Sequence, residues 1–150
     1  MMMYQIQKTI TSLLLSEKNI VLNNPFKRQL QDEQQYTLFI GDMIEAYTPV
    51  KMGNNIQAEL NIDIVIVGTD EALNNSALID VLSVMNSQQL KIALVNEKVN
   101  VSSITHESTE RVISDDSTEL YESKRCVFKL VYIYSQPKIN NNDDDEQTSE

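Results

Sequence analysis

Carboxylates are the side chains of this sequence with the largest number of candidate chemical roles. Glu59 and Asp63 lie four residues apart on one face of an expected strand, which separates them by about 13 Å at the rise of a strand. Carboxylate pairs that hydrolyse glycosidic bonds stand roughly 5–9.5 Å apart, so we expect these two to be solvated. The acidic runs at 115–116 and 143–145 lack the spaced ligands and the glycine of a calcium loop. We therefore expect no metal site there.

The single cysteine and the single histidine are the next candidates for catalysis. A nucleophilic set of Cys126, His106 and Asp115 is conceivable, because such groups meet in space rather than in sequence. Their spacing gives it no support, and a cysteine within an apolar alternation is typical of a small core residue. We expect Cys126 to be buried and His106 to be exposed. The sequence thus predicts no catalytic residue, no cofactor and no enzymatic activity.

Nucleotide and nucleic-acid binding also lack their usual signatures. The three glycines, Gly41, Gly53 and Gly68, each fall at an expected strand end, and none belongs to a phosphate-binding loop. The formal net charge of −10 has the wrong sign for gripping phosphate backbones, and the simplest meaning of such acidity is solubility. The remaining interpretation is a protein that works through its surfaces.

Two strands are expected to form the centre of the fold. In the segment 56–67, IQAELNIDIVIV, apolar and polar residues first alternate, and the last residues are apolar on both faces. This pattern predicts a strand that is half-solvated at one end and covered on both faces at the other. The segment 126–134, CVFKLVYIY, has the same character. We expect these two strands to be hydrogen-bonded neighbours.

Helices and further strands are expected around this pair. An apolar stripe at helical spacing predicts a helix over 2–17, and a second helix is predicted from a cap at Asn75 or Ser76 to about 86–89. The remaining segments predict a strand at 36–40, an edge strand or arm at 43–52, a hairpin of 91–95 with 99–104, and a ribbon at 105–120 that turns at 115–117.

The expected fold class is therefore α+β. It consists of a mainly antiparallel sheet with two helices packed on one face and a β-ribbon and arm, in a single domain over residues 1–136. Residues 137–150 carry five carboxylates and one lysine, and we expect an acidic tail that is disordered when the protein is alone.

Three segments together carry a resemblance to a known family: QIQKTITSLLL, ELNIDIVIVGTDEALNNSALIDVL and ITHESTERVISDDSTELYESKRCVFKLVYIY. Over residues 5–134 this order of elements resembles the tail-terminator (tail-completion) proteins of long-tailed bacteriophages. The resemblance implies a homo-oligomeric ring, usually of six copies, that caps the tail tube, ends its polymerisation and joins the tail to the head connector. It implies a place in the neck of the virion, after assembly in the host cytoplasm. The polar stretch 27–35 and the acidic tail depart from the family pattern.

Such a ring would have the tail tube protein and the connector or other neck proteins as partners, with a sheath protein as a further candidate. DNA would pass through without specific binding and no membrane would be involved. We expect the arm and the ribbon to make the contacts between copies, because exposed strand edges are suited to pairing. Packing within one chain is the rival explanation. The apolar candidates at this interface are Ile44, Tyr47, Val50, Met52, Val112 and Ile113.

A chaperone for a secreted protein is the main alternative. A small, acidic α/β protein of the cytoplasm can bind an extended client as a dimer along an apolar groove. An enzyme is a third interpretation, which would require a deep pocket lined by ionisable groups with shifted pKa values. No apolar run approaches the roughly 20 residues that span a bilayer, and the N-terminus lacks the basic start and cleavage site of a signal peptide. We therefore expect a cytoplasmic protein that becomes part of a particle.

Overall fold

Three helices and four strands make up the part of the fold that the structure describes. The computed structural model describes residues 2–23, 36–49, 55–116 and 119–135, and within these ranges it places all side chains except those of 49, 112–122, 134 and 135. The fold class is α+β, as the sequence predicts. Along the chain the elements are α1 (Met3–Lys18), β1 (Tyr36–Pro49), β2 (Asn55–Gly68), α2 (Glu71–Met85), α3 (Gln88–Asn96), β3 (Asn100–Asp116) and β4 (Glu119–Ser135).

The strands form one antiparallel sheet in the order β1-β2-β4-β3. The central strands β2 and β4 are paired without interruption, from Asn55 opposite Ser135 to Gly68 opposite Glu122. This confirms the prediction that the two most apolar segments are neighbours. The two expected surface elements, the arm and the ribbon, lie in β1 and in the β3–β4 pair, so β1 and β3 form the opposite edges of the sheet.

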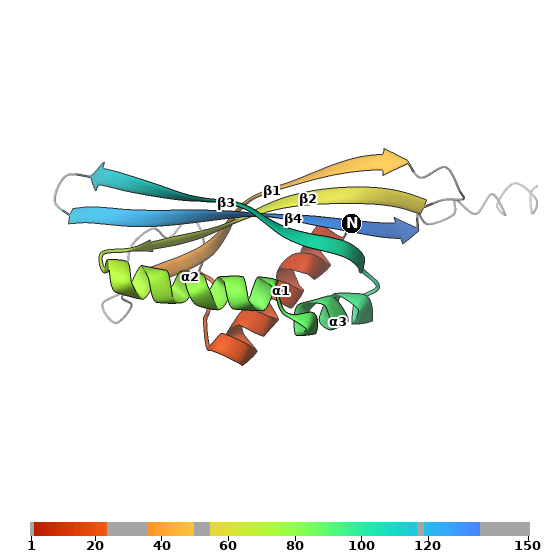
Figure 1. Ribbon diagram of the computed structural model, residues 1–150, viewed down its shortest axis with the longest axis horizontal. Coiled ribbons are helices and arrows are strands. Elements are labelled where there is room, and N and C mark those ends of the chain that lie inside the picture. Colours follow the sequence, from red (N-terminus) through yellow and green to blue (C-terminus); the bar gives the residue numbers. More distant parts are fainter. Residues whose placement is uncertain (1, 24–35, 50–54, 117–118, 136–150) are drawn as a thin grey trace, which may run out of the picture.

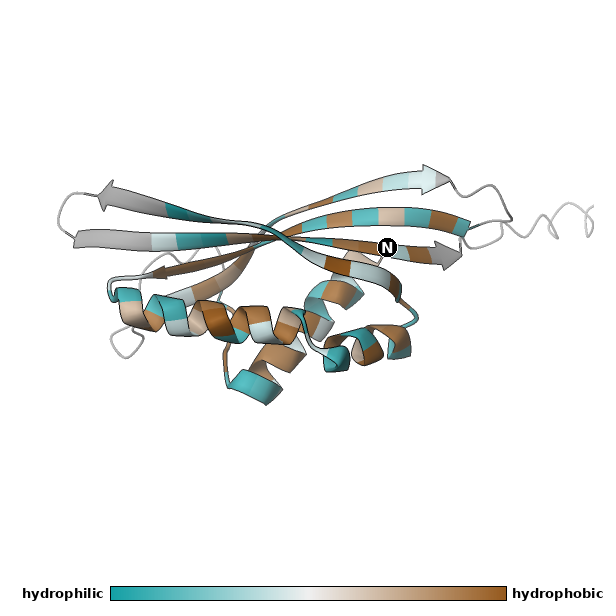
Figure 2. Ribbon diagram, viewed as in Figure 1, coloured by the Kyte–Doolittle hydropathy of each residue, from teal (hydrophilic) through white to brown (hydrophobic). Residues whose placement is uncertain are grey.

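Among the described residues, the three helices cover one face of the sheet and the other face carries no helix (Figure 1). We call these the covered face and the open face. Apolar and polar bands alternate along β2 (Figure 2), because successive side chains of a strand point to opposite faces. Three cross-strand pairs on the covered face have no exposed surface: Leu60 with Leu130, Ile62 with Phe128, and Ile64 with Cys126.

Helix α1 closely matches its prediction. Ile6, Ile10 and Leu14 have no exposed surface and lie along one stripe of the helix. The helix ends at Lys18, and Asn19 adopts the left-handed conformation (φ 58°). Asn19 N–H donates to Leu15 O and Ile20 N–H donates to Leu14 O, both at 3.0 Å. Asparagine tolerates this conformation better than most residues, which explains why the helix stops there.

Helix α2 begins at Glu71, earlier than the predicted cap at Asn75 or Ser76. Asp70 is the actual cap, since its Oδ1 accepts a hydrogen bond from Ala72 N at 2.9 Å. The prediction treated the polar residues up to Asn75 as a connection. The error arose because Asn74 is polar yet fully buried, with its Nδ2 donating to Gly68 O at 3.2 Å.

Helix α3 replaces a predicted strand. The hairpin of 91–95 with 99–104 does not form; 91–95 is helical and only the second segment is a strand, at the start of β3. Ser87 caps the helix by accepting from Leu90 N at 3.2 Å, and Leu90 and Leu94 are buried four residues apart. A short apolar run fits either structure, and here the cap and the helical spacing decide. The two predicted helices are therefore three.

The edge strands are irregular and the central strands are not. In β1 the register shifts between Ile40 and Met43, and in β3 it shifts between Val101 and Ser103 and again between His106 and Ser108. The predicted end of the first strand at Gly41-Asp42 is such a bulge, and β1 continues to Pro49. Bulges at sheet edges bend and twist the strand and limit pairing with other chains.

The predicted acidic tail, the polar stretch 27–35 and the turn at residue 117 lie outside the described residues. Within the described ranges, no helix has the length and apolarity needed to cross a bilayer.

Candidate interaction surfaces

Two of the six predicted interface residues are placed by the structure, and both are exposed. Ile44 and Tyr47 lie on β1 with 65% and 51% of their surface accessible. They are three residues apart and so point to opposite faces of the sheet. More than half of the surface of each side chain is therefore left uncovered by the rest of the described structure.

The other four predicted interface residues are only partly described. Val50 and Met52 lie outside the described residues, in the connection between β1 and β2. Val112 and Ile113 belong to β3, where they pair with Ser123 and Glu122, but their side chains are outside the described set. Ile44 and Tyr47 thus lie on one edge strand of the sheet and Val112 and Ile113 on the other, and these four are not brought together within one chain.

An ion pair lies at the centre of the open face. Both Nε and Nη2 of Arg125 on β4 contact Oδ2 of Asp63 on β2, with Nε at 2.7 Å. The Asp63 side chain is only 7% exposed, whereas that of Arg125 is 45% exposed. The expectation that Asp63 is solvated is thus wrong, because the guanidinium covers it.

The bulge of β1 contributes to this site. Gly41 and Asp42 together lie opposite Asp63, and a Cβ added to Gly41 would lie 3.4 Å from the Asp63 Cβ. The pKa of Arg125 is raised, chiefly by its hydrogen bond to Asp63 and by that carboxylate's charge, with smaller contributions from Glu110 and Asp42. Arg125 therefore remains a cation at any accessible pH and is surrounded by carboxylates.

A second cross-strand pair repeats the pattern farther along the same face. Lys129 Nζ lies 3.4 Å from Glu59 Oε2, and both side chains are more than one-third exposed. In each pair the β4 cation reaches the β2 carboxylate diagonally rather than directly across, since Lys129 pairs with Asn61 and Arg125 with Val65. The expectation of a solvated Glu59 agrees with its exposure.

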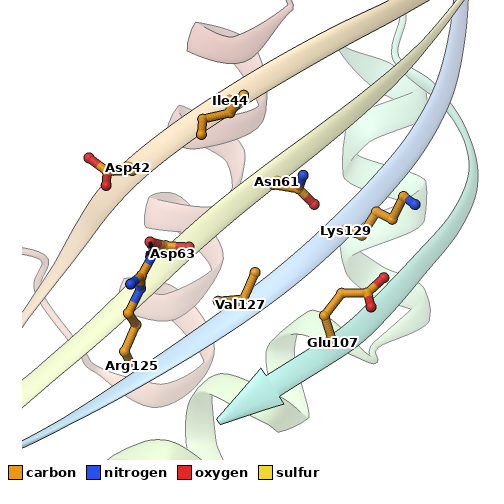
Figure 3. Close-up of a pocket in the computed structure, with 8 residues that line it drawn as sticks. All are labelled: Asp42, Ile44, Asn61, Asp63, Glu107, Arg125, Val127 and Lys129. Atoms are coloured by element: carbon orange, nitrogen blue, oxygen red, sulfur yellow. Dashed lines mark hydrogen bonds and ion pairs between the residues drawn. The ribbon is translucent and has the colours of Figure 1, made fainter. Parts of the chain in front are cut away.

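Between these pairs the open face has a shallow depression of about 420 Å³. Figure 3 shows the side chains that line it, which come from all four strands. Charged groups dominate the site, but the described residues contain no group of three or more histidines, cysteines or carboxylates that could hold a metal ion. Most of its lining is charged or polar, unlike the predominantly apolar lining of typical small-molecule sites. The lining residues are Asp42, Ile44, Asn61, Asp63, Glu107, Arg125, Val127 and Lys129.

A cluster of hydrogen bonds fixes the position of the exposed Tyr47. Its hydroxyl donates to Glu45 Oε2 at 2.7 Å, and the fully buried Tyr132 donates to the other oxygen of the same carboxylate. Tyr132 on β4 reaches β1 by passing over Ala58 on β2, which lies directly between the two tyrosines in the register. The small alanine side chain leaves room for that phenol. The cluster ties three strands together on the covered face.

Cys126 and His106 lie near each other but do not form a reactive site. Thr109 Oγ1 is 2.7 Å from His106 Nε2 and 3.9 Å from Cys126 Sγ, and the His106 ring lies against Phe128 with centroids 5.2 Å apart. Burial raises the pKa of the Cys126 thiol, so the thiolate is disfavoured. The buried cysteine and the exposed histidine agree with their predictions. The side chain of Asp115 is outside the described set.

No family model and no curated protein sequence matches this chain. A match does exist among solved structures, to a chain of a structure described as the virion of a native gene transfer agent particle. The TM-score is 0.51 at 12% sequence identity, over 87% of this chain and 91% of that chain. The two chains share a fold. Because the match covers nearly all of both, the whole arrangement of helices and sheet is shared rather than one motif.

Sequence reasoning missed the pairing of Asp63 with Arg125 and the role of Glu45. The diagonal spacing of charges on β2 and β4 could have indicated the first, once these strands were paired in the correct register. The second depends on the register of three strands and on the small size of Ala58 between the two tyrosines, which no local pattern reveals.

Proposed function

We propose that this protein is a structural component of a phage-like virion. The observation that carries the proposal is the fold shared with a chain of the gene transfer agent virion, over nearly the full length of both chains. The exposed Ile44 and Tyr47 on an edge strand support it, because a subunit of an assembly must present contact surfaces that its own chain leaves uncovered.

More specifically, we propose a tail-terminator role at the neck of the particle. Copies of the chain would form a ring, of six subunits in the simplest case, that caps the tail tube, ends its polymerisation and joins it to the head connector. The sequence resemblance and the separate placement of the arm and the ribbon on opposite edges support this finer assignment. Two different patches at opposite edges suit a head-to-tail contact that closes into a ring.

The acidity of the chain fits passage of DNA through such a ring. A net charge of −10 gives no electrostatic attraction to the phosphate backbone, so DNA would slide through the lumen without being held. Replacing acidic residues of the lumen with lysine should slow DNA transit. An unchanged ejection rate would argue against this role for the charge.

The deciding experiment is negative-stain electron microscopy of the purified chain, alone and mixed with tail tubes of the same particle. The expected result is rings, or monomers that assemble only as caps at tube ends. Light scattering on the same samples gives the mass. Uniform dimers that never cap a tube would overturn the proposal and favour a chaperone for an extended client instead.

A further inference from the structure

The open face of the sheet has the size of a contact surface for another protein. Its four strands overlap along most of β2, which has 14 residues. At the usual spacing and rise of strands the face is roughly 19 Å wide and 46 Å long. That area, on the order of 900 Å², is close to what each partner contributes to a standard protein–protein interface. Among the described residues no helix covers it (Figure 1).

Apolar side chains lie in the middle of this face. Val127, Val131 and Ile133 lie on the same side of β4 as its cations, because alternate residues of a strand share a face. Each of the three remains partly exposed. A sheet face that contacts only water usually carries polar residues at such positions. Partly exposed aliphatic side chains within a polar border are typical of a surface that a second protein covers.

The open face also carries an excess of negative charge. Five carboxylates and two cations point to it, and the cations are engaged by Asp63 and Glu59 in the ion pairs described above. Elsewhere among the described side chains, carboxylates and cations are equal in number. The excess charge of the described side chains therefore lies on this face. Its carboxylates are Asp42, Glu59, Asp63, Glu107 and Glu110, and its cations are Arg125 and Lys129.

The three carboxylates outside the ion pairs lie on both edge strands. Asp42 is on β1, whereas Glu107 and Glu110 are on β3, and all three residues are exposed. Figure 3 shows Asp42 and Glu107 on opposite sides of the depression. Three strand spacings, roughly 14 Å, separate the two edges, so these carboxylates do not converge on a single metal ion. They are placed to receive several cations of one extended partner.

The sign of the charge selects the class of partner. A phosphate backbone or an anionic lipid surface would be repelled. A second copy of this chain would bring its own net charge of −10. A different protein that presents lysine or arginine side chains is attracted, because such an interface is electrostatically complementary.

We propose that the open face binds a basic segment of another virion protein, whose cations contact Asp42, Glu107 and Glu110 and whose apolar side chains cover the valines of β4. This inference rests on the proposed function and assigns one surface of the chain to a partner within the particle. The open face is distinct from the outer edges of the sheet, so this contact and a ring contact can coexist in one assembly.

Binding of a basic peptide to full-length variants tests the contact. The probe is a fluorescein-labelled amphipathic peptide of lysine and leucine, titrated by fluorescence anisotropy at about 0.15 M salt. A triple variant, Asp42→Asn with Glu107→Gln and Glu110→Gln, neutralises the open face. Its dissociation constant should be about tenfold higher than that of the native chain, because charge contacts at both edges are lost. The amides are close in size to the carboxylates that they replace, and the positions are exposed.

A matched triple variant removes the same charge from the helical side of the molecule. Glu17→Gln, Glu71→Gln and Glu97→Gln are at exposed positions in α1, in α2 and at the end of α3. This variant should bind the peptide within about twofold of the native chain, since rim charges outside an interface contribute little. The acidic residues 143–146 are unchanged in both variants, so their attraction to the peptide cancels. Equal weakening by the two variants, or no binding to the native chain, would overturn the proposal.

Carbodiimide coupling locates the bound peptide. The reagent joins a lysine amine of the peptide to a nearby carboxylate as an amide, with loss of water, and mass spectrometry identifies the coupled residue. We expect coupling at Asp42, Glu107 and Glu110. Coupling chiefly to the helices or to residues 143–146 would contradict the proposed position.

The outcomes separate this inference from the proposed function. Peptide binding that depends on the open face, in a chain that never forms rings or caps tubes, would support the docking face and remove the terminator role. Rings and tube caps, with equal peptide binding by the two triple variants, would overturn the docking face and leave the virion role intact.

Discussion

Asp63 is a nearly buried carboxylate on the open face of the sheet, and it forms an ion pair with Arg125. We expect Arg125→Leu to lower the urea midpoint of unfolding, because Asp63 would remain buried without its cation, which is more unfavourable than losing both partners. The double variant Asp63→Asn with Arg125→Leu should be more stable than Arg125→Leu alone. Equilibrium urea unfolding at neutral pH measures both.

Lys129→Leu is the matched control for that prediction. It removes the cation of an ion pair whose carboxylate, Glu59, is 41% exposed and so remains solvated. Its effect should be about half that of Arg125→Leu or less, since exposed pairs contribute little. Equal losses from the two variants would mean that the burial of Asp63 has no energetic consequence.

The buried thiol of Cys126 predicts a dependence of stability on alkaline pH. Burial raises its pKa above the ordinary value of 9.0, so above pH 9 the unfolded chain loses a proton that the folded chain keeps. The contribution of the thiol to the free energy of unfolding is therefore fully present below pH 9. It is lost as the pH rises toward the pKa of the folded state, by at most about 1.4 kcal/mol per pH unit. We expect the free energy of unfolding of Cys126→Ala to fall less between pH 8 and pH 10 than that of the native chain.

Tyr36 also lowers the free energy of unfolding as the pH rises, but at higher pH. Burial, and to a smaller extent the charge of Asp80, raises the pKa of its phenol above 10.0. This contribution is common to both proteins and cancels in the comparison. If the free energies of unfolding of Cys126→Ala and the native chain fall with pH at the same slope, the pKa of the thiol is the same in the folded and unfolded states.

At the scale of elements, the tyrosine–glutamate cluster depends on a small residue in β2. Ala58 has no exposed surface and lies between Tyr47 and Tyr132. We expect Ala58→Leu to lower the free energy of unfolding by about 1–3 kcal/mol, the usual effect of overpacking, because the larger side chain would displace the phenol of Tyr132 from Glu45. Ala46→Leu, on the exposed side of β1, is the control and should change stability by less than about 0.5 kcal/mol. Similar losses for both would refute the packing argument.

The junction of α2 and α3 depends on one serine. Ser87 Oγ donates to Val84 O at 2.7 Å and accepts from Leu90 N at 3.2 Å, so it ends one helix and begins the next. Ser87→Ala should destabilise the protein by about 1 kcal/mol in thermal or urea unfolding. Ser83→Ala, at an exposed position within α2, should be neutral or slightly stabilising, since alanine favours helix.

The sequence predicted the elements whose pattern is strong over many residues and failed where a short segment depends on its surroundings. Helix α1 and the central strands β2 and β4 follow from periodicity alone, whereas the ribbon was predicted from the turn residues at 115–117. Helix α3 was mistaken for a strand because a short apolar run fits either structure, and the start of α2 was missed because a buried Asn74 resembles a loop residue. The sequence indicated which segments carry the candidate surfaces. It did not predict the ion pair of Asp63, because that requires the register between two strands that are distant in sequence.

At the scale of the whole molecule, the exposed apolar residues of β1 provide the test of assembly. We expect Ile44→Glu to prevent ring formation or capping while leaving thermal stability within about 0.5 kcal/mol of the native chain, because the side chain is 65% exposed and contributes little to the fold. Electron microscopy with tail tubes and a thermal melt measure the two properties. Ile79→Glu, equally exposed on α2, should still assemble. Normal assembly of Ile44→Glu would exclude this residue from the contact.

The position of β4 in the middle of the sheet affects how the chain can fold during synthesis. β4 is the last described strand, yet it lies between β2 and β3, and the residues that it pairs with in β2 precede it by more than fifty positions. While the ribosome is still making β3, β4 does not yet exist, so β2 has no neighbouring strand along one of its two edges. Contacts between such distant segments form slowly, so the sheet closes only after the C-terminal strand has left the ribosome. Until then the nascent chain exposes a strand edge that would aggregate readily, and its dependence on chaperones is expected to be greatest during translation.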